Sequence, residues 1–327
     1  MCDRPANVQW FKEMVQDHID KSTKDEEESG INVHDILIIP GDISHQLKLI
    51  ESTFIEAKKG YDDVFFIPGN HEMWCTNSSK YSSSLDKIQD IIHLCNTLNV
   101  SYYPVYYPDC NLLITPLWSW YHASWDTSDR TSFIAYCTAN SSNPIPFEDK
   151  WVDFHLCKWP SSIESHEEIT CLKSNSQKLA KYFSSFNESW LERFINNNDD
   201  EKEKEKSILT TTSDDSTRKD DMEIISFSHF VPLQELIPKY LFHDELRKVA
   251  GSNPLKEQIY LLKPNTHVFA HTHLPVDTII DDVRYIQWSL GTGEERHTSC
   301  SKIDKNGPLC IFDNLDKIEC DDGFFGF

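Results

Sequence analysis

The chain has 327 residues, 39% of them hydrophobic and 12% aromatic, and its formal net charge at pH 7 is −22. This composition is globular, and the length is sufficient to bury a large core. No apolar run reaches the roughly 18 residues of a transmembrane helix, so we expect no membrane span. No basic face is visible for a nucleic-acid duplex, which argues against extended nucleic-acid binding.

The N-terminal sequence and the distribution of cysteines indicate the cellular compartment of the protein. Residues 6–21, ANVQWFKEMVQDHIDK, are amphipathic and lack the apolar core of a signal peptide. The ten cysteines are scattered without a C-x-x-C pair, which favours reduced thiols in such a chain. We therefore expect a cytoplasmic protein and leave its oligomeric state open.

The N-terminal part of the chain alternates between helix and strand patterns. Residues 7–19 have apolar side chains at helical spacing, and a polar stretch follows through Gly30. Residues 35–42, DILIIPGD, are a short apolar run that ends in Pro-Gly, typical of a strand buried on both faces. Residues 45–60 predict a helix, and residues 63–72, DVFFIPGNHE, repeat the strand pattern.

The alternation continues to about residue 118. Residues 85–98 predict another helix, and residues 102–107 and 111–118 read as strands. Strands that alternate with helices in this way predict an α/β fold with right-handed crossovers.

Residues 120–221 interrupt the pattern. They begin with an irregular, aromatic-rich stretch, and residues 164–196 then predict a long helix. Residues 196–221 are charged and of low complexity, typical of a disordered surface loop.

Strand patterns return at residues 223–230, 267–275 and 277–290. We predict a single domain over residues 1–327 with residues 120–221 as an insertion, because motifs on both sides of the insertion carry the same chemistry.

Residues of types that can bind metals follow four of the predicted strands: Asp42 in PGDIS, Asn70 and His71 in PGNHE, His229 in SHF, and His271 and His273 in AHTH. Residues just past the carboxyl ends of strands in an α/β sheet converge on one crevice. Each group alone has an ordinary explanation, since such an Asp more often caps a turn and such a His is more often a hydrogen-bonded core residue. Their joint occurrence favours a metal site.

These motifs resemble those of the calcineurin-like metallophosphoesterase superfamily. The family's G-D, G-N-H-E, strand-end His and G-H-x-H blocks correspond to GDIS, GNHE, SHF and AHTH, within residues 1–118 and 222–295. The resemblance implies a four-layer α/β/β/α sandwich, in which helices flank two β-sheets and a two-metal site lies at the strand ends. It also implies hydrolysis of phosphomono- or diesters by a metal-bound hydroxide, with a phosphorylated compound as substrate.

The resemblance implies a role for each residue: Asp42 bridges both metals, Asn70, His229 and His271 bind the second metal, and His273 binds the first. Mixed nitrogen and oxygen ligands suit Mn, Fe or Zn. His71 is the expected catalytic residue, which stabilises the transition state or protonates the leaving oxygen. Glu72 either orients the site from behind or is an ordinary surface residue.

The D-x-H block that opens the family has no counterpart here. Met1 stands near the position of its histidine, so the first strand and two ligands of the first metal are missing. The first metal site is then incomplete, with Asp42 and His273 as its ligands and Asp3 as a weak substitute. Three explanations stay open: a sequence that starts downstream of the natural start, a divergent one-metal enzyme, or a non-catalytic descendant. We favour the first because the other motifs are intact.

Other functions and an aromatic segment also stay open. The second hypothesis is a non-catalytic or weakly catalytic binding protein that uses the insertion as a partner surface, and the third is a structural zinc site. The acidic charge favours small-molecule substrates. In PLWSWYH, the residues Trp118, Trp120 and Tyr121 either shape the substrate pocket or cover the sheet, and His122 is a candidate phosphate contact.

Overall fold

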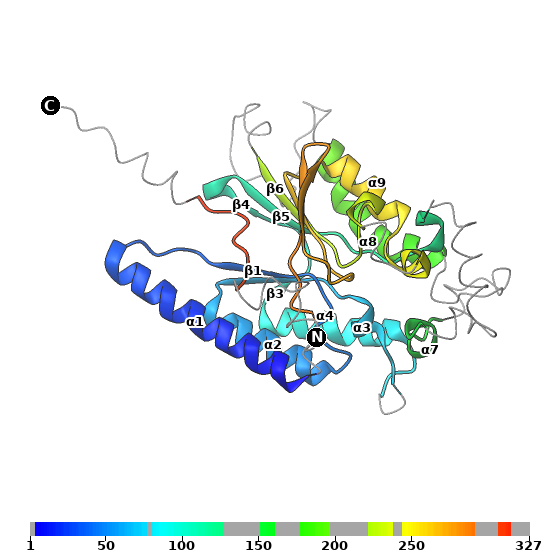
Figure 1. Ribbon diagram of the computed structural model, residues 1–327, viewed down its shortest axis with the longest axis horizontal. Coiled ribbons are helices and arrows are strands. Elements are labelled where there is room, and N and C mark those ends of the chain that lie inside the picture. The colour runs from blue at the N-terminus through cyan, green and yellow to red at the C-terminus, as the bar shows by residue number, and fades with distance from the viewer. Residues whose placement is uncertain are drawn as a thin grey trace.

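The protein is described by a computed structural model that covers residues 4–76, 80–126, 151–160, 177–196, 222–237, 244–291 and 307–314. Two β-sheets lie face to face, and helices cover the outer side of each sheet (Figure 1). The predicted four-layer α/β/β/α arrangement is confirmed. Asp3 and most of the predicted disordered loop, residues 197–221, lie outside the described residues.

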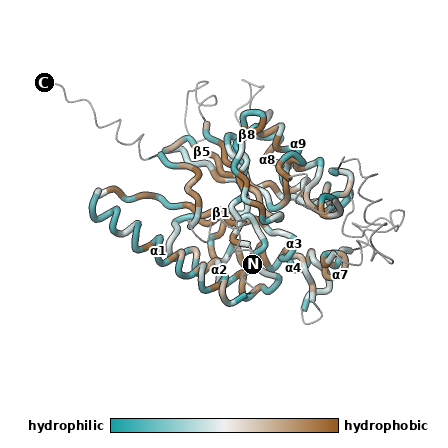
Figure 2. The backbone as a smooth tube through the Cα atoms, viewed as in Figure 1, coloured by the Kyte–Doolittle hydropathy of each residue, from teal (hydrophilic) through white to brown (hydrophobic). Residues whose placement is uncertain are grey.

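The first sheet is parallel throughout. Its strands are β1 (Ile36–Ile39), β2 (Asp63–Phe66) and β3 (Val100–Ser101), in that order across the sheet. The helices on its outer face are α1 (Pro5–Ser29), α2 (Leu47–Gly60) and α4 (Ser84–Leu98) (Figure 1). Figure 2 shows that β1 is hydrophobic along its length, whereas α1 carries many hydrophilic residues.

Within the described residues, the second sheet has six strands in the order β4 (Val105–Tyr107), β5 (Leu112–Pro116), β6 (Glu223–Phe227), β7 (Thr266–Val268), β9 (Val283–Gln287) and β8 (Val276–Ile280). The four inner strands are parallel, and the two outer strands pair antiparallel with their neighbours. Helices α8 (Gln177–Asn196) and α9 (Asn253–Leu262) cover its outer face (Figure 1).

Short helices complete the described elements: α3 (Asn70–Met73), α7 (Asp153–Leu156), η1 (Pro108–Cys110), η2 (Ala123–Trp125), η5 (Gln234–Leu236) and η6 (Asp244–Val249). Within the described part of the chain, no helix is both long and apolar enough to cross a membrane.

The strands divide their side chains between two cores, as the period of two requires. Val64 and Phe66 of β2 pack with the helices of the first sheet, whereas Phe65 between them packs toward the second sheet. The ring of Phe65 meets that of Phe227 on β6 edge to face, with centroids 6.2 Å apart. This central core holds the strand ends of the two sheets together.

The first strand differs from its prediction. All four residues of β1 are only half-buried, although the apolar run predicted a strand buried on both faces. β1 lies at the edge of its sheet, and among the described strands it pairs with β2 alone. An edge strand keeps one side open, so its side chains retain exposure.

The first helix is longer than its amphipathic pattern indicates. It continues through the polar stretch to Ser29 and ends at Gly30, whose φ of 71° is the left-handed conformation that glycine adopts readily. The amphipathic pattern marks only the packed part of a helix, whereas charged residues such as Lys24 and Glu28, paired at 3.6 Å, prolong it in solvent.

The described parts of the predicted insertion pack into the central core. The ring of Trp120 contacts that of Trp159, with centroids 5.0 Å apart, and that of Phe183 in α8, with centroids 5.5 Å apart. Cys157 forms an isolated antiparallel bridge with Trp74, just after α3. The later part of the predicted helix over 164–196 is confirmed by α8, and its predicted start lies outside the described residues.

A buried histidine on β7 gives a prediction about stability. His267 lies between two hydroxyls, with Ser226 Oγ 2.7 Å from Nδ1 and Ser228 Oγ 3.0 Å from Nε2. Burial lowers the pKa of His267 to about 3. The unfolded chain takes up a proton near pH 6.5, so stability is lost as pH falls from about 6.5 toward 3.

His267→Gln removes this titration. When the pH falls from 6.5 to 4.5, we therefore expect the free energy of unfolding of the variant to decrease by about 2 kcal/mol less than that of the wild type. Urea unfolding at several pH values measures the difference. Parallel pH profiles for the two proteins would show that His267 is protonated in the folded state.

Candidate metal centre

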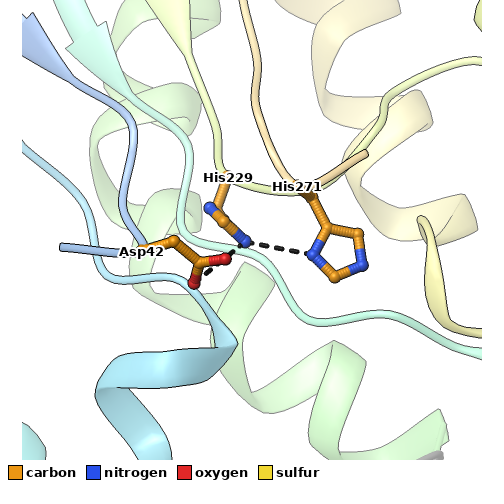
Figure 3. A group of neighbouring side chains, drawn as sticks. All are labelled: Asp42, His229 and His271. Atoms are coloured by element: carbon orange, nitrogen blue, oxygen red, sulfur yellow. Dashed lines mark hydrogen bonds and ion pairs between the residues drawn. The ribbon is translucent and has the colours of Figure 1, made fainter. Parts of the chain in front are cut away.

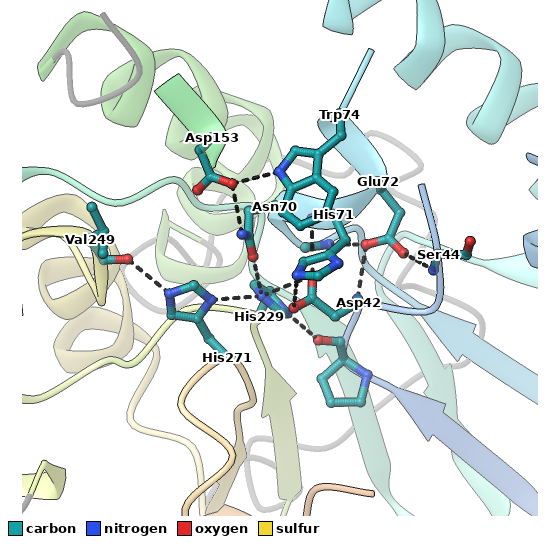
Figure 4. Close-up of polar contacts among 12 residues, drawn as sticks. Asp42, Ser44, Asn70, His71, Glu72, Trp74, Asp153, His229, Val249 and His271 are labelled. Atoms are coloured by element: carbon teal, nitrogen blue, oxygen red, sulfur yellow. Dashed lines mark hydrogen bonds and ion pairs between the residues drawn. The ribbon is translucent and has the colours of Figure 1, made fainter. Parts of the chain in front are cut away.

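The carboxyl ends of four strands, two from each sheet, meet at one place. Asp42 follows β1, and Asn70 and His71 begin α3 directly after β2. His229 follows β6, and His271 follows β7. The sequence prediction that these segments converge is therefore confirmed for Asp42, Asn70, His71, His229 and His271, as Figure 4 shows.

The ligand atoms of Asp42, His229 and His271 all lie within 4.8 Å of one another (Figure 3). His229 Nε2 is at the centre, 3.4 Å from Asp42 Oδ1 and 3.2 Å from His271 Nδ1. The amide oxygen of Asn70 is also 3.2 Å from His229 Nε2. These four atoms are the candidate metal centre.

Hydrogen bonds to backbone carbonyls determine which ring nitrogen of His229 and of His271 carries a free lone pair toward this centre. His229 Nδ1 is 2.8 Å from Pro40 O, and His271 Nε2 is 2.9 Å from Val249 O. A carbonyl only accepts, so each of these nitrogens carries the hydrogen and donates it. In the neutral imidazoles, His229 Nε2 and His271 Nδ1 are then acceptors that face each other at 3.2 Å.

Two facing lone pairs repel unless a proton or a metal cation lies between them. Here a carboxylate oxygen and an amide oxygen join the two nitrogens, which is the mixed donor set of a transition-metal site. Ligands about 2.1 Å from one ion lie about 3.0–3.4 Å from each other, and the other three atoms lie 3.2 to 3.4 Å from His229 Nε2. The residues therefore fit a divalent cation.

The charge state of the cluster also suits a cation. Burial alone raises the pKa of Asp42, but His229, His71 and His271 together with the His71 N–H hold it well below its usual range. Burial lowers the pKa of His271 to about 3, and the nearby Asp42 carboxylate opposes that effect only in part. At neutral pH the centre thus presents an ionised carboxylate and a neutral His271.

The backbone at this centre is in an uncommon conformation. Asp42, His271 and His273 have φ angles of 59°, 72° and 57°, in the left-handed region that non-glycine residues rarely adopt. Gly69 is needed because a Cβ there would lie 2.3 Å from Asp42 Oδ1. Strained residues of this kind are concentrated at functional sites, where the surrounding structure holds them.

Glu72 orients the site from behind and is not a surface residue. It is completely buried, and its carboxylate accepts three backbone N–H groups, from Asp42 at 2.9 Å, Ser44 at 3.0 Å and Gly69 at 2.7 Å (Figure 4). One side chain therefore holds the loop that carries Asp42 against the start of α3.

His71 lies beside the cluster rather than in it. Its backbone N–H donates to Asp42 Oδ1 at 3.1 Å, and its Nε2 is 3.8 Å from Asp42 Oδ2. The ring stacks on Trp74 with centroids 3.7 Å apart, and the side chain is 20% exposed. The position is compatible with a proton-transfer role, which stays a prediction.

The first metal site is not assembled by the described residues. His273 is half-buried and lies outside the group formed by Asp42, His229 and His271. Its assignment to a first metal stays a prediction, and Asp3 lies outside the described residues.

The aromatic segment after β5 covers the sheet. Trp118, Trp120 and Tyr121 are all buried in the central core, so the simpler of the two interpretations holds. His122 accepts the N–H of Ser124 and begins a 3₁₀ turn.

Sequence reasoning missed one residue that lies directly behind the centre. Asp153 of α7, inside the predicted insertion, is completely buried and accepts a hydrogen bond from Asn70 Nδ2 at 2.9 Å. Burial raises its pKa, and hydrogen bonds from Asn70, Trp74 and other donors counter that effect. An Asp in an irregular segment carries no sequence signal that links it to a strand end 83 residues away.

Comparison with known proteins supports the fold. No protein-family model matches the chain, and no curated protein matches its sequence. Among solved structures, phosphopantetheinyl hydrolase (PptH) from Mycobacterium tuberculosis is similar, with a TM-score of 0.54 and 17% identity over 81% of this chain and 82% of that one. TT1561 from Thermus thermophilus matches with a TM-score of 0.36 and 8% identity over 84% of each chain. At these identities the likeness to PptH concerns the fold alone.

Proposed function

We propose that this chain is a metal-dependent phosphoesterase that hydrolyses phosphomono- or diesters at a dinuclear centre. The observation that carries the proposal is the group of four acceptor atoms formed by His229 Nε2 and the atoms of Asp42, Asn70 and His271 that lie around it. The group lies at converging strand ends of a fold shared with a protein named as a hydrolase. The sequence resemblance to metallophosphoesterases is independent support.

Asp42, Asn70, His229 and His271 would hold one ion, and Asp42 with His273 would contribute to a second. Divalent ions bound there would neutralise the charge of a phosphate ester and lower the pKa of water. The residues of the chain supply the frame for this chemistry, because Glu72 holds the backbone of Asp42 and the His71 N–H donates to the Asp42 carboxylate.

His71 would supply a proton. Trp74 holds its ring in place by stacking, and the partly exposed ring lies next to Asp42. An imidazolium at this position can stabilise negative charge on the phosphoryl oxygens or protonate the leaving oxygen. The net charge of −22 favours a small phosphorylated substrate over an extended nucleic acid.

A binding protein with a single metal ion is the second candidate. It is favoured by one observation, that the described residues assemble one complete ligand group and leave His273 outside it.

Metal analysis together with hydrolysis assays tests the function. We expect the chain to hydrolyse p-nitrophenyl phosphate or bis(p-nitrophenyl) phosphate with Mn²⁺, Fe²⁺ or Zn²⁺, and EDTA to remove the activity because the metal provides the charge that the site lacks. A phosphopantetheinyl conjugate is a third substrate to include, since PptH is named for that group.

Asp42→Asn protein, purified in the same way, controls for contaminating phosphatases. Turnover with two bound ions supports the dinuclear enzyme. A single ion without turnover supports the binding protein or a structural site, and no turnover with all three metals and substrates contradicts the proposal.

A further inference from the structure

Asp153 is surrounded by hydrogen-bond donors. Its Oδ1 accepts from Asn70 Nδ2 at 2.9 Å and from Trp74 Nε1 at 2.6 Å. Its Oδ2 accepts from Trp151 Nε1 at 2.8 Å and from the Tyr121 hydroxyl at 3.0 Å. These donors come from three parts of the chain, around α3, at Tyr121 and just before α7, and they converge on one carboxylate that is completely buried.

The two indoles determine the direction of the hydrogen bonds. An indole N–H can only donate, so both oxygens of Asp153 act as acceptors where Trp74 and Trp151 meet them. The amide of Asn70 then presents its NH₂ group to Asp153, and its Oδ1 points to His229 Nε2 at 3.2 Å (Figure 4). A reversed amide would place its oxygen against the carboxylate and its NH₂ in the metal centre.

The segment that carries Asp153 is joined to the loop that carries Asn70. The N–H of Cys75 donates to Leu156 O at 2.7 Å, and Trp74 forms a bridge with Cys157. The ring of Trp151, in the same segment, lies with its centroid 6.3 Å from that of His271. The α7 segment is therefore hydrogen-bonded to the chain just after Asn70, and its Trp151 lies beside His271.

We propose that Asp153 is a positioning residue that fixes the carboxamide of Asn70, so that Oδ1 is the atom offered to a divalent cation held by Asp42, His229 and His271. A hydrogen-bond partner behind a metal ligand sets the orientation of that ligand, and its loss typically weakens metal binding by about 10–100-fold. The proposal rests on the metal centre of the proposed function but not on its catalysis.

Calorimetric titration with Mn²⁺ tests the proposal. In Asp153→Asn, an NH₂ group replaces one acceptor oxygen, and an NH₂ group that faces Asn70 can no longer accept the hydrogen bond from its amide. We therefore expect the Mn²⁺ dissociation constant to rise by about 10–100-fold. Tyr121→Phe is the matched control, because it removes a donor from the other oxygen of Asp153 and leaves Asn70 held. We expect less than about a threefold change there. Equal effects of the two variants would indicate a purely structural role and overturn the proposal.

A second variant does not depend on how Asp153→Asn folds. A carboxylate is ordinarily at least as good a ligand as an amide for such ions. If nothing lay behind residue 70, Asn70→Asp would therefore not weaken metal binding. With Asp153 behind it, the new carboxylate faces another carboxylate and loses a hydrogen bond, and we expect the Mn²⁺ dissociation constant to rise. Unchanged or tighter binding overturns the proposal.

The same titrations separate this proposal from the proposed function. A wild-type chain that binds no Mn²⁺ overturns both. Binding that is weakened in Asp153→Asn, in a protein that hydrolyses no phosphate ester, supports the positioning role and contradicts the enzyme.

Discussion

Asp42→Asn is expected to abolish phosphate-ester hydrolysis while the fold is retained. Asp42 is the carboxylate of the four-atom centre, and it is ionised because its pKa is held well below its usual range. Asparagine has the same shape and an oxygen that can still accept the His71 N–H, but it has no charge to balance a divalent cation. The loss should exceed the roughly 100-fold that removal of a supporting residue can cause.

Steady-state hydrolysis of p-nitrophenyl phosphate and Mn²⁺ titration measure the effect, with circular dichroism as the test of folding. Asp109→Asn, an exposed position in η1, is the matched control and should behave as the wild type. His271→Ala is expected to have the same effect as Asp42→Asn because it removes another of the four ligand atoms. Near-wild-type rates of hydrolysis in either variant would contradict the assignment of that residue to a catalytic centre.

Glu72→Gln is expected to lower the free energy of unfolding by about 2–3 kcal/mol. The glutamine has only one oxygen, so at least one of the N–H groups of Asp42, Ser44 and Gly69 meets an NH₂ group instead of an acceptor. A buried donor without a partner keeps its full desolvation cost. The loop that carries Asp42 also loses its anchor, so we expect weaker Mn²⁺ binding in the same variant.

Urea unfolding without metal isolates the stability effect from the binding effect. Glu51→Gln on the exposed side of α2 is the control, and it should lie within about 0.5 kcal/mol of the wild type. A similarly small change in Glu72→Gln would mean that other groups hold the two loops together.

The two variants distinguish two ways in which the centre can fail. Asp42→Asn removes the charge of a candidate ligand from an intact frame, whereas Glu72→Gln keeps every candidate ligand and loosens the frame. Hydrolysis that is lost in the first and reduced in the second is the pattern expected if the geometry of the strand ends, and not only the identity of the ligands, supports activity.

Local patterns in the sequence predicted the elements of this fold well. Apolar runs that end in Pro-Gly correspond to β1 and β2, and the run before SHF corresponds to β6. These predictions succeed because the alternation of apolar residues and the stops made by Pro and Gly act over a few neighbouring residues. The same reasoning located Asp42, Asn70, His71, His229 and His271 at strand ends, where an α/β topology brings them together.

Only the tertiary structure decided how exposed β1 is, because burial depends on which strands lie beside it and not on its own apolar residues. Contacts between distant segments likewise determined the surroundings of two carboxylates. Glu72 had two open interpretations, and the structure decides between them because its carboxylate accepts N–H groups from the loop of Asp42 and Ser44 as well as from the nearby Gly69. Asp153 had no interpretation at all, since its donors are separated from it by up to 83 residues and lie in segments with no common pattern. The sequence thus determined which candidate ligands lie at the strand ends, and only the tertiary structure showed that the insertion packs against α3 and places Asp153 beside Asn70.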